Sequence, residues 1–177
     1  MTVDEARELI ARITAIVNAQ LEDRIRIYET KILPELKRNH VVFYQDAEHL
    51  DENHRAFIRR FFLEEIFPFL QPVKIERERV RMFLRDKRLY LAVRVRCKET
   101  GEREYYILKM PYSKVSRFVE LPKKGEDFYL MFLEDIIQAN LKEMFIGYEV
   151  ECSYCCKISR DADVFVDDVR PNTWWSS

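Results

Sequence analysis

Apolar residues recur about every 3.7 residues near the start of this 177-residue chain, at Ile10, Ile13, Val17, Leu21, Ile25, Tyr28, Ile32 and Leu36. This period is helical, so it predicts one long amphipathic helix, or a kinked pair, over residues 4–39. Pro34 removes a backbone donor and crowds the preceding turn, so we expect a bend near residues 30–33. The narrow apolar stripe suits packing against a helix of a second copy, and equally suits packing on the domain's own sheet.

Two further patterns complete the first half of the chain. The β-branched and aromatic run at residues 41–44 predicts a short strand. Asp51 can cap the first turn of a second helix, which carries apolar residues on one broad face. Pro68 and Pro72 end that helix.

Strand patterns dominate the second half. Alternating apolar residues from Leu89 to Val95 predict a strand with one buried face, and a turn at Gly101 brings residues 105–108 back beside it. Further strands are predicted at 128–132 and 150–158, on either side of a helix at 133–145 that Gly147 closes.

These patterns predict an α+β fold, with a long N-terminal helix plus a mostly antiparallel sheet packed with two further helices. We expect a helical segment at residues 1–39, one domain at 40–168 and an irregular C-terminal tail at 169–177. The content of 47% hydrophobic and 34% charged residues is that of a globular protein.

The N-terminus does not read as a signal peptide, and no apolar run approaches the ~18 residues of a membrane span. We therefore expect a cytoplasmic protein with no membrane partner. Four cysteines in such a protein are expected to be reduced thiols.

Positive charge is concentrated between Lys74 and Lys98. This segment holds ten basic and three acidic residues, a net charge of +7 in a chain whose total is −1. Strand alternation places its basic residues in two rows that suit phosphate oxygens: Arg77, Arg79 and Arg81, and Arg94, Arg96 and Lys98. The alternative is a solvated sheet face with Glu76, Glu78 and Glu104 as partners. No Phe or Trp interleaves with these arginines in a stacking pattern, which counts against single-stranded nucleic acid as the polyanion, and we do not expect a nucleic acid partner.

Several common catalytic and metal motifs are missing. The three glycines stand more than twenty residues apart, so they cannot form a phosphate-cradling loop. His40, His49 and His54 show no metal spacing and are expected to be solvated surface histidines. Cys152, Cys155 and Cys156, together with Cys97, fit buried and inert thiols better than a zinc site, and the acidic residues near the C-terminus fit a solvated end.

An ordered series of motifs resembles the head domain of bacterial polyphosphate kinases. The motifs are Phe83–Asp86, Tyr90–Val93, Arg117–Pro122, Leu133–Ile137 and Ser159–Asp163. The resemblance implies an enzyme that transfers the γ-phosphate of ATP onto polyphosphate with Mg²⁺. It also implies a head domain that takes part in subunit contacts and lies at the mouth of a polyphosphate tunnel.

The resemblance places the catalytic histidines of the family in C-terminal domains, and no position of this sequence matches them. We therefore expect no catalytic residue, no metal ligand and no cofactor in this chain, with ATP and Mg²⁺ belonging to the parent enzyme. Arg117, Arg160 and Asp161 lie inside the family motifs and are expected to have structural roles.

The expected function is that of a head domain fragment of a polyphosphate kinase. It would serve subunit association through the first helix and the head domain, work with the catalytic domains of the parent, and guide polyphosphate on the basic segment. The alternative is a stand-alone interaction module that acts through its N-terminal helix. From the sequence we expect a fragment, a truncated gene product or a stand-alone relative.

Overall fold

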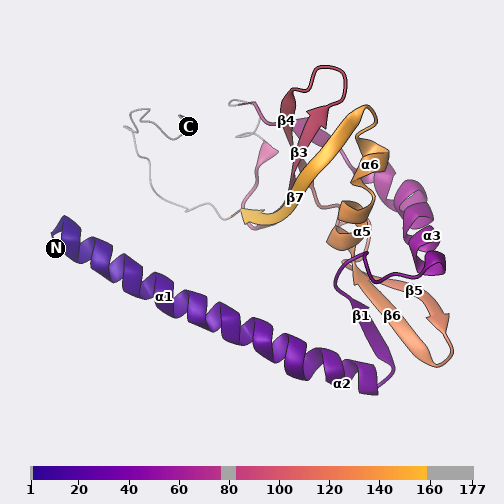
Figure 1. Ribbon diagram of the computed structural model, residues 1–177, viewed down its shortest axis with the longest axis horizontal. Coiled ribbons are helices and arrows are strands. Elements are labelled where there is room, and N and C mark those ends of the chain that lie inside the picture. Colours follow the sequence, from indigo (N-terminus) through magenta and orange to yellow (C-terminus); the bar gives the residue numbers. More distant parts are fainter. Residues whose placement is uncertain (1, 77–82, 159–177) are drawn as a thin grey trace. The chain divides into compact units, whose positions relative to one another are not determined.

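The computed structural model describes residues 2–76 and 83–158. Its elements have the mixed α+β order that the sequence predicts, and Figure 1 labels most of them. The helices are α1 (Val3–Ile27), η1 (Tyr28–Ile32), α2 (Leu33–Arg38), α3 (Glu52–Phe61), η2 (Phe62–Ile66), η3 (Phe67–Phe69), α5 (Leu133–Ala139) and α6 (Leu141–Met144). The strands are β1 (Val41–Tyr44), β2 (Pro72–Lys74), β3 (Arg88–Cys97), β4 (Arg103–Lys109), β5 (Phe118–Lys124), β6 (Asp127–Phe132) and β7 (Tyr148–Ile158).

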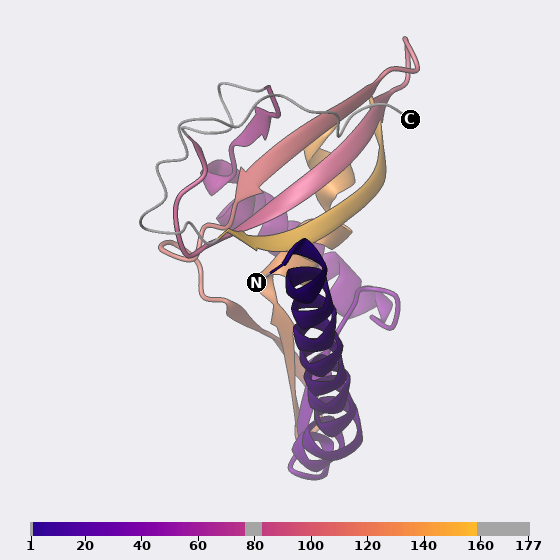
Figure 2. The same cartoon turned by 90° about the vertical axis from the view of Figure 1, so that its left-hand side faces the viewer.

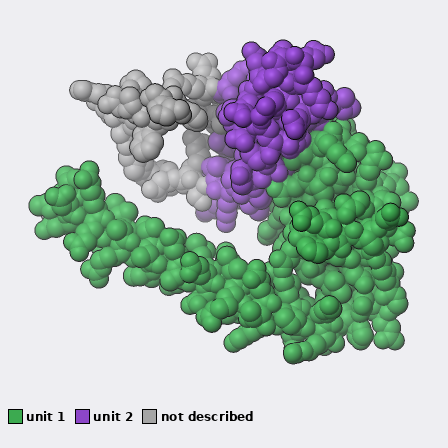
Figure 3. Space-filling model, in the orientation of Figure 1, with its two compact units in different colours: residues 1–69, 111–144 green, residues 70–110, 145–177 purple. Residues whose placement is uncertain are grey.

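The chain forms two compact units, drawn in green and purple in Figure 3. Unit 1 comprises Met1–Phe69 and Pro111–Met144, and unit 2 comprises Leu70–Met110 and Phe145–Ser177. The ranges predicted from the sequence, 1–39, 40–168 and 169–177, stay predictions. The last of them lies outside the described residues.

The long N-terminal helix begins at a complete capping box. The Thr2 hydroxyl accepts from the backbone N–H of Glu5, and the Glu5 carboxylate accepts from the N–H of Thr2 at 2.7 Å, so two orphan donors of the first turn are satisfied. The predicted bend region contains η1, a π-helical turn in which the N–H of Leu33 donates to the carbonyl of Tyr28. The Thr30 hydroxyl also donates to the Arg26 carbonyl at 2.6 Å, which favours a local distortion.

Both π-helical turns of the described chain end two residues before a proline. η1 precedes Pro34, and η2 precedes Pro68 in the same way. A proline ring collides with the carbonyl four residues earlier and offers no N–H to it. Widening the turn to an i→i−5 ladder moves that carbonyl aside, and α2 continues past Pro34 to Arg38. After η2 only the short 3-10 helix η3 (Phe67–Phe69) follows, so the second helix ends near Pro68 as predicted.

Unit 1 is built on a three-stranded sheet of order β1-β6-β5. β1 runs parallel to β6, and β5 and β6 form an antiparallel hairpin closed by Gly125 at φ +61°. Pro122 lies in β5, an edge strand, next to a register shift, which is where a strand tolerates a residue without a backbone donor. α3 contacts β5, and α5 follows β6 directly.

The core of unit 1 is apolar side chains from its helices and its sheet. The buried ones are Leu50, Ile58, Phe62, Ile66, Val119, Leu121, Met131, Leu133, Ile136, Ile137 and Leu141. Burying one such side chain contributes roughly 1.5–3 kcal/mol, so α3, η2 and α5 are held mainly by this contact with the sheet and with each other.

Unit 2 is built on a four-stranded antiparallel sheet of order β2-β4-β3-β7. Figure 2 shows its long strands, coloured from pink to yellow, lying side by side. Leu91, Val93 and Val95 of β3 are buried between less buried neighbours, so the predicted alternation holds from Leu91 to Val95. Tyr90, which the alternation places on the other face, is also buried. Gly101 closes the β3–β4 turn at φ +74°, and Gly147 has φ +85°, so both glycines take the left-handed conformation expected of them.

The helix predicted at 133–145 is not continuous. It ends at Ala139, and α6 begins at Leu141. Asn140, 4% exposed, donates from Nδ2 to the Ile136 carbonyl at 2.8 Å and so competes with the backbone ladder at this point. Within residues 2–76 and 83–158, none of the helices combines the length and the apolar character that crossing a membrane requires.

Candidate functional site

Three arginines of unit 2 converge on one carboxylate, that of Glu151 in β7. Arg96 donates to Glu151 Oε1 from Nε at 2.6 Å and also from Nη2. Arg103 Nε donates to Oε2 at 3.1 Å. Arg94 Nε lies 2.7 Å from Oε2 but without hydrogen-bond geometry, so this contact is an ion pair. We call these four residues the arginine cluster.

A β-bulge explains why Glu151 reaches the arginines. Arg94 lies opposite Cys152 and Val95 lies opposite Val150, so Glu151 is an extra residue without a partner in β3. Arg103 lies opposite Arg96 on the other side of β3, which brings a third guanidinium to the same face.

The arginine cluster carries more positive than negative charge. The Glu151 side chain is 9% exposed, whereas those of Arg94, Arg96 and Arg103 are 40%, 43% and 55% exposed. Hydrogen bonding from Arg96, followed by that from Arg103, holds the pKa of Glu151 below its ordinary value. With the carboxylate ionised, the four side chains of the arginine cluster carry a net charge of +2. The exposed Glu149, opposite Arg96, lies on the same face.

The other predicted basic residues have different positions. Lys98 is exposed in the turn after β3, and Arg77, Arg79 and Arg81 lie outside the described residues. β3 is paired on both sides, by β4 and β7. Arg103 and Glu151 therefore flank Arg94 and Arg96, and sequence reasoning named neither of them for this face.

Glu104 has a different partner set. It forms an ion pair with Lys74 at 2.9 Å and accepts from the Tyr106 hydroxyl at 2.7 Å. These bonds, with that from Lys74 the largest, hold the pKa of Glu104 below its ordinary value. Glu104 thus neutralises Lys74 rather than Arg94 or Arg96.

The motif residue Arg117 lies in a second ion-pair cluster, in unit 1. Its Nε and Nη2 both donate to Glu134 Oε1, at 2.9 and 2.7 Å, and the Tyr112 hydroxyl donates to Oε2 at 2.8 Å. The guanidinium also lies 5.0 Å from the Phe132 ring centroid. Glu134 is 6% exposed, so this network ties the start of β5 to the start of α5. Arg160 and Asp161 lie outside the described residues.

Asp135 lies beside this network in an unfavourable setting for a charge. Burial, followed by the nearby carboxylates of Glu134 and Asp46, raises the pKa of Asp135 to about 7. Arg117 acts in the opposite direction but does not offset them. The Asp135 carboxyl is therefore about half-protonated near neutral pH.

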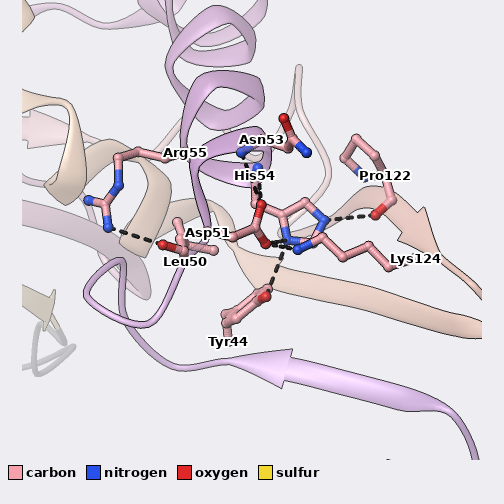
Figure 4. A network of polar contacts seen from close by, with 8 residues as sticks. All are labelled: Tyr44, Leu50, Asp51, Asn53, His54, Arg55, Pro122 and Lys124. Carbon is pink, nitrogen blue, oxygen red and sulfur yellow. Dashed lines mark hydrogen bonds and ion pairs between the residues drawn. The ribbon is translucent and has the colours of Figure 1, made fainter.

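His54 lies at the centre of a buried polar network that Figure 4 shows. Its Nε2 donates to the Pro122 carbonyl at 2.8 Å, and its Nδ1 lies 3.2 Å from the Tyr44 hydroxyl and 3.1 Å from Asp51 Oδ2. Asp51 caps α3 by accepting from the N–H groups of Asn53 and His54, as predicted, and Lys124 forms an ion pair with it. The network joins α3 to β1 and β5.

The prediction of a solvated surface histidine is wrong for His54, which is 0% exposed. Its ring packs 4.7 Å from that of Tyr129, and both of its nitrogens contact protein atoms. The side chains of His40 and His49 are 56% and 79% exposed and lie 2.8 and 2.9 Å from Asp127 and Asp46.

None of the four cysteines forms a disulfide within the described part of the chain. The prediction that they are buried is wrong for Cys155, which is exposed at the edge strand, and the other three are half-buried. Among residues 2–76 and 83–158, no three histidine, cysteine, aspartate or glutamate side chains come together in a way that could hold a metal ion.

The apolar stripe on α1 is exposed. No residue of α1 is buried, and Ile10, Ile13 and Val17 are 63%, 52% and 44% exposed. Near its C-terminal end a groove of about 700 Å³ lies between α1, η1 and Phe132, lined by Ile25, Ile27 and Tyr28 among others. The stripe is thus not packed on the sheet of its own unit over most of its length.

The family model described as the polyphosphate kinase middle domain matches residues 53–172. The chain belongs to the polyphosphate kinase family. Polyphosphate kinase from Halalkalibacterium halodurans is 32% identical over 145 residues, which are 82% of this chain and 20% of that protein. The Pseudomonas aeruginosa enzyme is 28% identical over 163 residues, 90% of this chain and 24% of the relative.

The fold agrees with the family. The crystal structure of polyphosphate kinase from Porphyromonas gingivalis superposes with a TM-score of 0.79 at 41% identity, covering 92% of this chain and 25% of that one. Both the predicted resemblance and the predicted fold class are confirmed. The chain spans 20–25% of the length of these polyphosphate kinases, and the match lies in their middle, or head, domain.

Proposed function

We propose that this chain is a head module of a polyphosphate kinase, which holds a polyphosphate chain on the arginine cluster of unit 2. The observation that carries the proposal is the convergence of Arg94, Arg96 and Arg103 on a single carboxylate. Arginine is well suited to phosphate because its planar fork of donors matches two phosphate oxygens. The charge excess of +2 attracts a polyanion, and the exposure of the three side chains lets it reach them.

Polyphosphate binding and its salt dependence test this role. Replacing Arg94, Arg96 and Arg103 by alanine should weaken binding of long-chain polyphosphate about tenfold or more, and should flatten the dependence of log K on log salt. A matched control removes three arginines from the exposed side of α3, at Arg55, Arg59 and Arg60. Equal losses in the two triple variants would show that net charge alone drives binding, and would end the proposal.

The second part of the proposed function is association with another copy through α1. Its apolar residues alternate with polar ones at helical spacing, stay exposed, and would lose contact with water against a partner helix. This same surface supports the alternative function, a stand-alone interaction module whose partner is a different protein. Self-association is favoured here because it requires no component besides the chain itself.

Light scattering after size exclusion tests association. Val17→Glu puts a charge on the apolar stripe, whereas Ala19→Glu adds the same charge on the opposite side of α1. We expect the unsubstituted chain and Ala19→Glu to elute as a dimer or larger species, and Val17→Glu to elute as a monomer. If the unsubstituted chain is a monomer, self-association is contradicted and the alternative function, binding of a different protein through α1, is favoured.

ATP and Mg²⁺ are implied by the family resemblance, and the described residues do not fit them. They bring together no set of metal ligands, and the glycines of the sequence are too far apart to cradle a phosphate. We therefore derive no phosphoryl-transfer step for this chain and assign that step to other parts of a polyphosphate kinase. Polymer formation by the purified chain with ATP and Mg²⁺ would overturn this assignment.

A further inference from the structure

The contacts within the arginine cluster are made on one side of each guanidinium group. Arg94 and Arg103 approach Glu151 with Nε, and Arg96 does so with Nε and Nη2. A guanidinium is planar and has five donors, so a group held at its Nε side keeps the terminal Nη1–Nη2 edge directed elsewhere. Because the three side chains are 40–55% exposed, these edges can meet a ligand from solvent.

We propose that Glu151 is a positioning residue, whose carboxylate holds the three guanidinium groups together so that their terminal nitrogens meet a phosphate chain as one surface. This inference rests on the proposed function of the arginine cluster. It adds a role for the one acidic residue of the cluster, which opposes polyanion binding by its charge and supports it by its position.

Without Glu151, two effects would weaken binding of a phosphate chain. Three like charges on neighbouring strands repel one another, and an arginine that is not held loses side-chain entropy when a ligand immobilises it. The shielded carboxylate offsets the repulsion and fixes the side chains before the ligand arrives, so less entropy remains to be lost on binding. The bulge in β7 sets the position of Glu151, which makes the arrangement part of the fold.

The alternative is that Glu151 competes with the phosphate chain for the arginine donors, and binding experiments distinguish the two roles. A carboxylate surrounded by arginines resembles a bound phosphate oxygen, so Glu151 could compete with the ligand for the same donors. A positioning residue and a competitor predict opposite signs for the effect of its removal once the change in net charge is controlled.

The test is equilibrium binding of long-chain polyphosphate to the full chain and three variants. Glu151→Asp keeps the charge but shortens the side chain, so it should bind about threefold to tenfold more weakly than the parent, because the arginines are held less well. Glu149→Gln removes one negative charge from the same strand, next to the cluster, and should bind slightly more tightly. Glu151→Gln removes the same charge, but should bind more weakly than Glu149→Gln.

A result in which Glu151→Asp binds as tightly as the parent, or Glu151→Gln at least as tightly as Glu149→Gln, would overturn the positioning role. Circular dichroism is recorded at the assay temperature, and loss of the folded spectrum in both Glu151 variants would also overturn it, in favour of a purely structural residue. If the parent chain binds no polyphosphate, or binds it equally with and without Arg94, Arg96 and Arg103, the proposed function fails and this inference fails with it.

Discussion

Glu134 in unit 1 and Glu151 in unit 2 are both shielded carboxylates bound by arginine, and they differ in how their charge is balanced. Their side chains are 8% and 9% exposed. Glu134 has one arginine and the Tyr112 hydroxyl, whereas Glu151 has three arginines. The two carboxylates are equally shielded from solvent but are paired with different numbers of arginines. We infer that Glu134 stabilises the packing of unit 1, and that Glu151 holds arginines in place for a ligand.

If the polar networks of unit 1 serve packing, opening the most buried one should have the largest effect on stability. His54→Ala removes the bond to the Pro122 carbonyl and leaves a cavity beside Tyr129, and should lower the free energy of unfolding by about 3 kcal/mol. Urea denaturation measures this. His49→Ala, at a side chain that is 79% exposed, is the control and should change little. Similar losses in both variants would contradict a packing role for His54.

The two carboxylates can be compared directly by the same substitution. Glu134→Gln removes the charge of the buried carboxylate to which Arg117 donates, and should lower the free energy of unfolding by about 2 kcal/mol. Glu151→Gln should shift the urea midpoint much less, because its arginines can turn towards water. A larger shift for Glu151→Gln would reverse the assignment of the two clusters.

Asp135 sharpens the contrast through pH. Its pKa is raised from 3.8 to about 7 in the folded state, so between about pH 4 and pH 7 the folded chain binds more protons than the unfolded one. Stability contributed by this group is therefore present below pH 4 and is lost as the pH rises through 7. Asp135→Asn removes a carboxylate that is unfavourable when ionised, so it should raise the free energy of unfolding at pH 8 by about 1–2 kcal/mol. The gain is smaller than the full pKa shift implies, because the carboxylate stays partly in contact with water.

Urea denaturation of the parent and Asp135→Asn at pH 4 and pH 8 checks the sign. The two proteins should nearly coincide at the lower pH and separate at the higher one. If the free energies of unfolding of the two proteins differ at pH 4 but coincide at pH 8, the expectation is contradicted.

The smallest expected change in stability is in the arginine cluster. Arg103→Ala should leave the urea midpoint within error, because its side chain is 55% exposed and the other two arginines keep Glu151 paired. It should still weaken polyphosphate binding about twofold to threefold and reduce the salt slope by about one. If Arg103→Ala lowers the free energy of unfolding but leaves polyphosphate binding unchanged, the arginine cluster serves packing, as the polar networks of unit 1 do.

Local rules predicted much of the fold. Asp51 was predicted as the cap of the second helix, Gly101 as the turn between two strands, and Pro34 as the cause of a distortion in the first helix. Each of these depends on one residue and its immediate neighbours, so one sequence is enough to predict it. The alternation in β3 persisted over enough residues to be equally clear.

The bulge at Glu151 could not be predicted in this way. Strict alternation places Val150 and Cys152 on one face, whereas in the structure they lie opposite Val95 and Arg94, which belong to different faces. No glycine or proline indicates the extra residue. The charge partner of Arg94 and Arg96 was therefore missed.

Two other features were missed because their signals are short. β5 alternates between buried Val119 and Leu121 and exposed neighbours for only a few residues before Pro122 interrupts it. His54 lies four residues before the buried Ile58, and that spacing could have placed it on the inner side of α3.

The widened turn at Tyr28–Ile32 determines how α1 is rotated about its own axis relative to α2, and so the direction in which its apolar stripe faces. Each residue of an α-helix occupies about 100° around the axis, so the additional residue held by an i→i−5 turn rotates α1 relative to α2 by roughly that angle. α2 contacts β1 and fixes the reference direction. A chain one residue shorter here would keep its proline and its sheet contact, yet would direct a different flank of α1, with its isoleucines turned aside, towards an incoming molecule.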